Sequence, residues 1–341
     1  MTRPLPRIGL RLHGELTARQ CVELAVAADR SGFSTAWFAE NAFARGSLPA
    51  AAACAVATSR LRIGAGVFNP FSRHPSMMAM EIGALDELSD GRAMLGIGAG
   101  IGSSVQKIGA SSDKPLLAVR DTLAILQPLL RGEPVTYVGR SFSATEVKLN
   151  YKPRADIPIY VAGRGDLTLK LTGESADGLL ISNMCSIEYA RHSANRVMES
   201  RTAAGRSGAP GIVQYMPCAV HKDRAEAQRT GKRAVGEMIP NYWNLSRKVA
   251  SAKEALFTGT GISEAEFENA ALRIKAGEDA AGFLDEKFTF AFSLTGTPDE
   301  CLDRAADYAA AGVTELALTF DGASAPDDIT LLGDALKQRL G

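Results

Sequence analysis

The sequence has few cysteines, no long apolar run and no excess of charge of either sign. Its 38 basic and 38 acidic residues cancel, so it offers no one-signed field for nucleic acid or an anionic membrane. The five cysteines are widely spaced and form no CxxC pair, which is typical of reduced, buried thiols. No apolar run approaches the roughly 20 residues that cross a bilayer, and residues 1–4 lead into a predicted strand rather than a signal peptide. These absences predict a soluble, cytoplasmic protein with neither nucleic-acid nor membrane partners.

The sequence also lacks the motifs of several enzyme classes. It contains no HExxH, no carboxylate–histidine cluster with the spacing of metal ligands, no Walker loop and no serine nucleophile elbow. Metal-dependent hydrolysis and acyl transfer therefore lose support. No metal site is predicted.

Short apolar runs alternate with helical stretches along the chain. Most of the runs are continuously apolar, as expected for a parallel sheet that is covered on both faces. The predicted strands are 7–12, 34–40, 60–68, 92–99, 157–163, 178–183, 212–220 and 314–320. The predicted helices between them are 17–31, 48–58, 75–89, 115–131, 166–176, 186–205 and 298–311. Eight such units favour a (β/α)8 TIM barrel of class α/β, because an open doubly wound sheet more usually stops at about five to seven strands.

Two segments do not fit this repeat. Residues 132–156 contain two strand-like pieces, 135–138 and 147–149, and predict a hairpin inserted before the fifth strand. Residues 222–296 are too long for one helix and predict a helical insertion between strands seven and eight. This insertion is interpreted either as a lid over the barrel or as support for packing or dimerisation. The whole chain, 1–341, is predicted to form a single barrel domain that ends in a helix from 327 to 340.

The active face of a barrel lies at the carboxyl ends of its strands, so the residues just past each strand are the candidates for chemistry. They are Arg11 and His13, Glu40 and Asn41, Gly66 to Asn69, Gly98 to Gly102, Gly163 to Asp166, Asn183, Met184 and Asp321. The turn Gly163-Arg164-Gly165 joins a strand to a helix, where free N–H groups and a guanidinium hold a phosphate. A glycine-containing turn at this point is also common for purely structural reasons.

Three segments together resemble a known superfamily. They are GAGVFNPFSRHP (64–75), SDGRAMLGIGAG (89–100) and IPIYVAGRGDLTLKLTGESADGLL (157–180). In this order and spacing they are similar to luciferase-like monooxygenases, in the branch of coenzyme F420-dependent oxidoreductases that includes methylenetetrahydromethanopterin reductase. The resemblance covers essentially the whole chain. It implies a (β/α)8 barrel with an insertion, a deazaflavin or FMN in the barrel mouth, and a homodimer.

The resemblance also implies where the cofactor would lie. A bulge in the third strand, with a non-prolyl cis peptide against the back face of the flavin, would fall at Gly66–Val67. An ordinary glycine-rich strand end is the alternative at this position. Asn69, Gly98 and Gly100 would line the ring and the ribityl chain. The phosphate would be held by Ala162, Gly163, Arg164 and Gly165.

Glu40 and Asn41 match positions that approach the ring or the substrate in members of this family, and with His13 they are the predicted proton-handling residues. As an alternative, Glu40 and Asn41 simply end a strand, and His74 is interpreted as a helix-entry residue. Sugar-phosphate dehydrogenases of this branch have His and Glu where this chain has Asn41 and Ile101. The methanopterin reductases tend to have acids where this chain has Arg11 and Ile101 or Gly102. Neither substrate is therefore predicted.

The sequence thus predicts an F420-dependent oxidoreductase that moves a hydride to or from a small organic substrate at the carboxyl face of the barrel. One alternative is an FMN-dependent monooxygenase that uses molecular oxygen. Another is a flavin-binding barrel without catalytic activity, which the small number of polar residues at the mouth allows.

Overall fold

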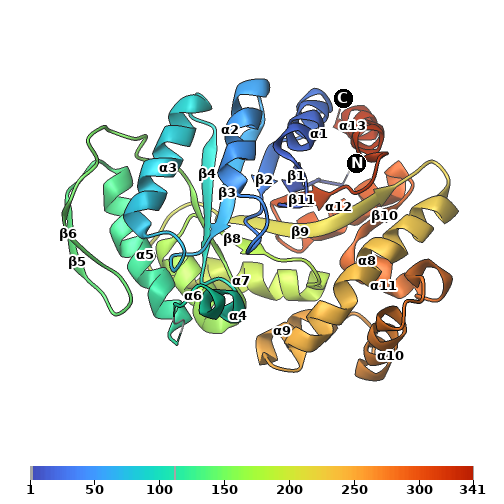
Figure 1. Ribbon diagram of the computed structural model, residues 1–341. Coiled ribbons are helices and arrows are strands. Elements are labelled where there is room, and N and C mark those ends of the chain that lie inside the picture. The colour runs from blue at the N-terminus through green and yellow to red at the C-terminus, as the bar shows by residue number, and fades with distance from the viewer. Residues whose placement is uncertain (1–2, 111–112, 341) are drawn as a thin grey trace.

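The fold is a closed parallel barrel surrounded by helices (Figure 1). The structure is a computed structural model and describes residues 3–110 and 113–340. The barrel strands are β1 (Arg7–Leu12), β2 (Thr35–Phe38), β3 (Arg62–Phe68), β4 (Ala93–Gly98), β7 (Ile159–Ala162), β8 (Gly178–Ile181), β9 (Gly211–Val220) and β11 (Glu315–Thr319). They pair in this order, and β11 pairs with β1 to close the ring. The predicted (β/α)8 barrel and all eight predicted strands are confirmed.

Helices follow the strands and cover the outside of the barrel. They are α1 (Ala18–Arg30), α2 (Ser47–Ala57), α3 (Pro75–Leu88), α4 (Gly102–Lys107), α5 (Pro115–Leu130), α6 (Asp166–Ser175), α7 (Ile187–Ala203), α12 (Pro298–Ala310) and α13 (Ala325–Leu340). Capping boxes begin α1 at Thr17 and α12 at Thr297, and each satisfies backbone N–H groups of the first turn. His74 is the N-cap of α3 and accepts a hydrogen bond from the Ser76 amide at 3.3 Å. The interpretation of His74 as a helix-entry residue is confirmed.

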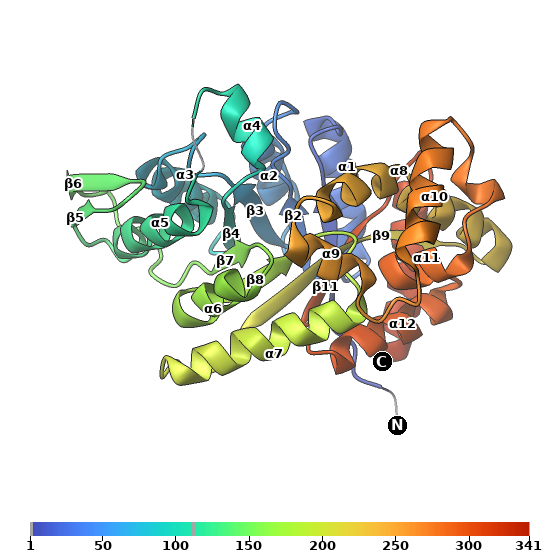
Figure 2. The same ribbon diagram turned by 90° about the horizontal axis from the view of Figure 1, so that it is seen from below.

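Two additions lie at opposite ends of the molecule in both views (Figures 1 and 2). The hairpin consists of β5 (Val135–Val138) and β6 (Ser143–Val147). Its second strand lies at 143–147 rather than at the predicted 147–149, because the turn after Val138 is short and pairs Val138 with Ser143. The other addition contains α8 (Arg224–Ser246), α9 (Ala250–Phe257), α10 (Glu264–Lys275), the 3-10 helix η1 (Ala280–Gly282), α11 (Glu286–Phe292) and the short strand β10 (Leu294–Gly296).

The added helices have an apolar core of their own. Trp243, Phe267, Phe288 and Phe292 pack together there, with Phe267 in contact with all three other rings. β10 extends the sheet beside the end of β9, where Leu294 pairs with Cys218. The sequence did not predict β10 or the short helix α4, because each is too short to show a period. Within the described residues, no helix is both long and apolar enough to span a bilayer.

The inside of the barrel has an aromatic layer above a polar floor. Trp37, Tyr160 and Tyr215 pack together in the interior, with ring centroids 5.3 Å apart for Trp37 and Tyr160. At the amino-terminal end, the fully buried Glu315 accepts hydrogen bonds from Trp37 Nε1 at 2.7 Å and Thr35 Oγ1 at 2.6 Å. This arrangement closes the floor, so a ligand has access only from the carboxyl ends of the strands.

Candidate functional site

The third strand carries a bulge at the barrel mouth. The register between β3 and β4 shifts between Ala65 and Phe68, and the Gly66–Val67 peptide bond is cis. A Cβ on Gly66 would lie 2.3 Å from the Gly96 carbonyl oxygen, and the φ of Gly66 is 138°. Only glycine fits there. The predicted bulge and cis peptide are confirmed, and the ordinary strand end is excluded.

Val67, Gly98 and Ala162 meet at the ends of β3, β4 and β7. A Cβ on Gly98 would lie 2.7 Å from Val67 Cγ1 and 3.0 Å from the Ala162 carbonyl oxygen. Val67 and Ala162 are partly buried against the aromatic layer inside the barrel. The absence of a side chain at Gly98 therefore lets Val67 pack directly against the backbone of β4, and a planar ring can lie against the wall that these residues form.

Asn69 and Gly100 are also brought together. A Cβ on Gly100 would lie 2.4 Å from Asn69 Nδ2, and Gly100 has a φ of +72°. Asn69 Oδ1 accepts a hydrogen bond from the Phe71 amide at 2.8 Å. That bond fixes the oxygen of the side chain in a local turn, so the Nδ2 group is the part of Asn69 that remains to donate elsewhere.

Glu40 forms an ion pair that the sequence did not predict. Arg73 Nη1 lies 2.8 Å from Glu40 Oε1, and Arg73 Nε lies 2.6 Å from Glu81 Oε2. The same guanidinium lies over the Phe68 ring, 4.2 Å from its centroid, and Ser47 donates to Glu40 Oε2 at 2.9 Å. Burial raises the pKa of Glu81 above its ordinary value, the Arg73 guanidinium opposes this shift, and the Glu40 carboxylate adds to it. Glu40 is thus held in one orientation by two donors.

Glu40, Asn41 and His13 have three separate sets of partners. His13 Nε2 lies 3.3 Å from Asp321 Oδ1. Asn41 is exposed, and its Oδ1 accepts a weak hydrogen bond from the Gly14 amide at 3.4 Å. The three predicted proton-handling residues therefore all lie at the carboxyl face of β1 and β2, but no hydrogen bond links one of them to another among the contacts of the described residues.

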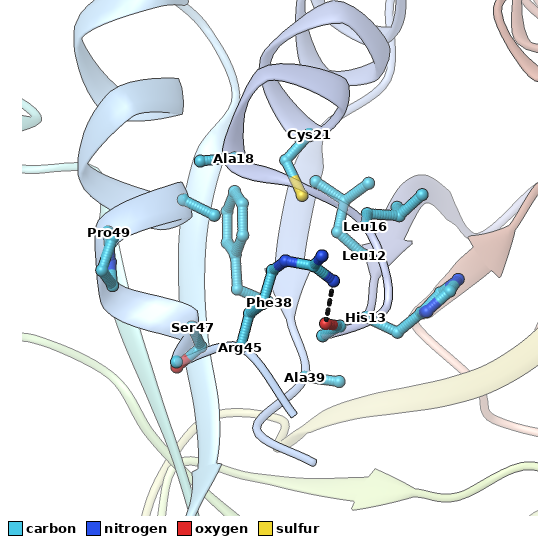
Figure 3. A pocket seen from close by; sticks show the side chains of 13 residues that line it. Leu12, His13, Leu16, Ala18, Cys21, Phe38, Ala39, Arg45, Ser47 and Pro49 are labelled. Atoms are coloured by element: carbon cyan, nitrogen blue, oxygen red, sulfur yellow. Dashed lines mark hydrogen bonds between the residues drawn. The ribbon is translucent and has the colours of Figure 1, made fainter. Parts of the chain in front are cut away.

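A small cavity of about 160 Å³ lies beside His13, between the first turns of α1 and α2 (Figure 3). Its wall is mainly apolar, and Figure 3 shows His13 projecting away from the ring of Phe38. The polar residues in the lining are His13, Arg45 and Ser47. Arg45 is engaged with the backbone, because its Nη1 donates to the Glu15 carbonyl oxygen at 2.8 Å. The cavity therefore offers apolar volume next to Ser47, which donates to Glu40, and the one guanidinium in its lining is hydrogen-bonded to backbone carbonyl oxygens.

The turn at Gly163–Gly165 joins β7 to α6, as predicted. The side chain of Arg164 extends from this turn to the residues that follow β8. Arg164 Nη2 donates to Ser182 Oγ and, at 3.4 Å, to the Asn183 carbonyl oxygen. The Gly165 amide donates to the Tyr189 hydroxyl at 3.4 Å. Burial raises the pKa of Tyr189 to about 12, so its hydroxyl stays protonated at neutral pH.

The added helices contribute to this part of the mouth. Arg164 lies over the ring of Tyr242 from α8, 5.6 Å from the centroid, and Gly165 faces Ser251 of α9, 3.5 Å from an added Cβ. Tyr242 and Ser251 could not be predicted from the sequence, because neither follows a predicted barrel strand or belongs to a motif. Arg73 lies within the segment 64–75, but only the fold brings its two carboxylate partners, Glu40 and Glu81, next to it.

Unpartnered polar atoms gather at the mouth. In the described part of the chain, buried side-chain atoms without a hydrogen-bond partner include three near strand ends at the mouth: Arg11 Nε, Arg164 Nε and Asn183 Oδ1. Buried polar groups are normally satisfied, and an unsatisfied one costs free energy. A polar ligand at the ends of β1, β7 and β8 would satisfy such atoms. Among the same residues, no three His, Cys, Asp or Glu side chains are grouped to hold a metal ion.

A (β/α)8 barrel with a glycine-faced wall and unpaired guanidinium groups at its carboxyl face has the architecture of a barrel enzyme that binds an anionic ligand. The family model described as luciferase-like monooxygenase matches residues 5–315. The chain belongs to this family.

The chain is similar to enzymes whose names include methanopterin reductases and an F420-dependent dehydrogenase. The chain is 31% identical over 299 residues to a 5,10-methylenetetrahydromethanopterin reductase of Archaeoglobus fulgidus, covering 85% of this chain and 86% of the relative. It is 28% identical over 190 residues to an F420-dependent glucose-6-phosphate dehydrogenase of Beutenbergia cavernae, covering 52% and 56%. The solved coenzyme F420-dependent tetrahydromethanopterin reductase of Methanopyrus kandleri has a TM-score of 0.81 at 24% identity, covering 99% of this chain and 100% of that one. This last similarity supports the fold.

Proposed function

We propose that this protein is an F420-dependent oxidoreductase that transfers a hydride to or from a small organic substrate at the carboxyl face of the barrel. The observation that carries the proposal is the backbone wall at Gly66 and Gly98 beside the Arg164 guanidinium, whose buried Nε has no hydrogen-bond partner in the described chain. Similarity to a methylenetetrahydromethanopterin reductase and to an F420-dependent dehydrogenase supports this cofactor and an enzymatic role over a non-catalytic barrel.

The residues at the mouth fit a flat ring with a phosphate-bearing tail. Val67, which packs on Gly98, would contact one face of the ring, and Asn69, which packs on Gly100, would lie beside the chain attached to it. Arg164 and the amides at the start of α6 would hold the phosphate. When bound, the deazaflavin supplies the site that donates or accepts the hydride.

The proton that accompanies the hydride needs a group at the carboxyl ends of β1 and β2. Glu40 is the best oriented, because Arg73 and Ser47 fix both of its oxygens. His13 is the second candidate, since Asp321 lies 3.3 Å from its Nε2. Asn41 has no ionisable group, and its role would be to donate a hydrogen bond to the substrate. These assignments are part of the proposal.

Spectral titration of the purified protein with F420 and with FMN tests the cofactor. We expect saturable F420 binding that the Arg164→Met variant weakens by about tenfold or more, as is typical for loss of a charge-assisted contact. Gly282→Ala is the matched control, since an added Cβ there meets no atom within 4 Å. Binding of FMN alone, with oxygen uptake by the reduced complex, would instead identify a monooxygenase. Binding of neither cofactor would refute the proposal.

We also propose that the protein is a homodimer and that it is cytoplasmic. A homodimer is supported by the exposed apolar side chains Val56 of α2 and Met77 and Met80 of α3, two helices that pack side by side. Light scattering on the eluting protein measures its mass directly, and a monomer would contradict the dimer. A cytoplasmic location is supported by five free, buried cysteines, which suit a reducing compartment.

A further inference from the structure

Arg11 is a second cation at the barrel mouth, separate from the phosphate turn. It precedes the last residue of β1, and β1 pairs with β11 so that Arg11 lies beside Thr319, the last residue of that strand. Its Nη1 donates to Thr319 Oγ1 at 3.3 Å, and its guanidinium carbon lies 5.2 Å from the centroid of the Tyr215 ring. Since Tyr215 belongs to the aromatic layer inside the barrel, the Arg11 side chain lies over the floor of the mouth.

No carboxylate of the described residues neutralises Arg11. Carboxylates on the neighbouring strands and loops form ion pairs with other groups: Glu315 with Arg7, Asp321 with His13, and Glu40 with Arg73. The Nε atom of Arg11 is buried and has no hydrogen-bond partner within the described chain. A guanidinium keeps its charge in any protein environment, so a partly buried and unpaired one is costly unless a ligand supplies the counter-charge.

The surroundings favour a small anion with one charge. Arg11 contributes a single guanidinium, and its neighbours are the Thr319 hydroxyl and the aromatic ring of Tyr215. The mouth at this point has no helix N-terminus, whereas the turn at Arg164 leads directly into α6 and suits a phosphate. A planar carboxylate matches the two-pronged donor geometry of a guanidinium.

We propose that Arg11 binds the carboxylate of the substrate, and that the protein acts on small organic acids. The proposal rests on the proposed function, because it places the substrate above the aromatic layer and next to the ring of the cofactor. Arg11 then fixes the end of the substrate remote from the reacting carbon. This geometry selects acids against their uncharged esters or amides.

Calorimetric titration with matched acids and esters tests the proposal. The probes are phenylglyoxylate and 2-oxobutanoate, each with its methyl ester, added to the protein alone and to the protein loaded with F420. We expect the acids to bind about tenfold tighter than the esters, or more, since a hydrogen-bonded charge pair is lost in the ester. Arg11→Met should abolish this preference, and Arg11→Lys should retain part of it because the charge remains. Arg60→Met is the control, since this arginine side chain is 67% exposed.

The outcomes separate this proposal from the proposed function. Equal loss of acid and ester binding in Arg11→Met would overturn it, as would a failure of both acids to bind the wild type at millimolar concentration. The proposal would also be overturned if Arg11→Met lowered the affinity for F420 as much as the affinity for the acids. That result would assign Arg11 to the cofactor. Failure to bind F420 or FMN refutes only the proposed function, because the acid–ester preference is also measured without cofactor. If Arg11→Met does not fold, Arg11→Gln removes the same charge and is judged by the same criteria.

Discussion

Replacing Arg73 by methionine should destabilise the protein in a pH-dependent way. The guanidinium contacts Glu40 at 2.8 Å and Glu81 at 2.6 Å, and the three side chains are only 20–30% exposed. Two unit charges 4 Å apart attract by about 4 kcal/mol at an effective dielectric constant of 20. Solvent screening at partly exposed sites reduces the measured contribution of each pair to about 1 kcal/mol. Loss of both pairs, with two carboxylates left facing each other, should therefore cost about 2–3 kcal/mol at neutral pH.

The sign of the pH dependence follows from Glu81. Its pKa in the folded protein is already raised by burial, and Arg73 opposes that shift, so removing Arg73 raises the pKa further. A carboxyl group with a higher pKa in the folded state binds more protons folded than unfolded. The free energy of unfolding then falls as the pH rises from the unfolded pKa through the folded one. The deficit of Arg73→Met should be smallest near pH 5 and largest near pH 8.

Urea unfolding at pH 5 and pH 8, followed by tryptophan fluorescence, measures this difference. The matched control is Arg131→Met, because the pair of Arg131 with Glu133 has side chains 47% and 52% exposed. We expect no change beyond experimental error in that variant at either pH. A deficit of Arg73→Met that is equal at both pH values, or larger at pH 5, would show that the paired carboxylates do not control the stability of this region.

Two further predictions concern the mouth and the cysteines. Gly98→Ala places a Cβ 2.7 Å from Val67 Cγ1, so it should cost about 1–3 kcal/mol of stability and weaken F420 binding at least tenfold by displacing Val67. The control variant Gly282→Ala should change neither the stability nor the affinity. Unchanged F420 affinity of Gly98→Ala in spectral titration would remove Gly98 from the cofactor site. Burial raises the pKa of Cys54 to about 12, so at pH 8 roughly one such thiol in ten thousand is a thiolate. Ellman's reagent should therefore label Cys54 at the rate of global unfolding, and fast labelling of the native protein would contradict its burial.

The barrel could be predicted because its signals are local and repeated. Eight apolar runs, each followed by a helical period, are readable without knowledge of the pairing, and helix caps such as Thr17 and Thr297 mark the beginnings. The bulge at Gly66–Val67 came from the family resemblance and not from these signals. The second strand of the hairpin was misplaced by several residues, because the short run at Ser143–Val147 is polar and its position depends on pairing with β5.

The site was predicted only in outline, because its residues interact across the barrel. The sequence placed Glu40 and His13 at strand ends but could not show that Arg73 and Asp321 are their partners, 33 and 308 positions away. Tyr242 approaches Arg164 from an added helix that has no counterpart in the barrel repeat. Strand ends limit where a side chain can act, whereas the partners that set its charge and orientation depend on the tertiary structure.

Three arginines at the mouth illustrate this distinction. Arg73 lies between two carboxylates and is neutralised within the protein, so its role is to position Glu40. Arg11 and Arg164 are hydrogen-bonded only to neutral oxygens within the described chain, and each has a buried Nε without a partner. Since a guanidinium cannot lose its charge to escape burial, these two arginines are the ones to which we assign anionic ligands. We therefore propose two anion sites at the mouth, one at Arg164 for the phosphate of the cofactor and one at Arg11 for the carboxylate of the substrate.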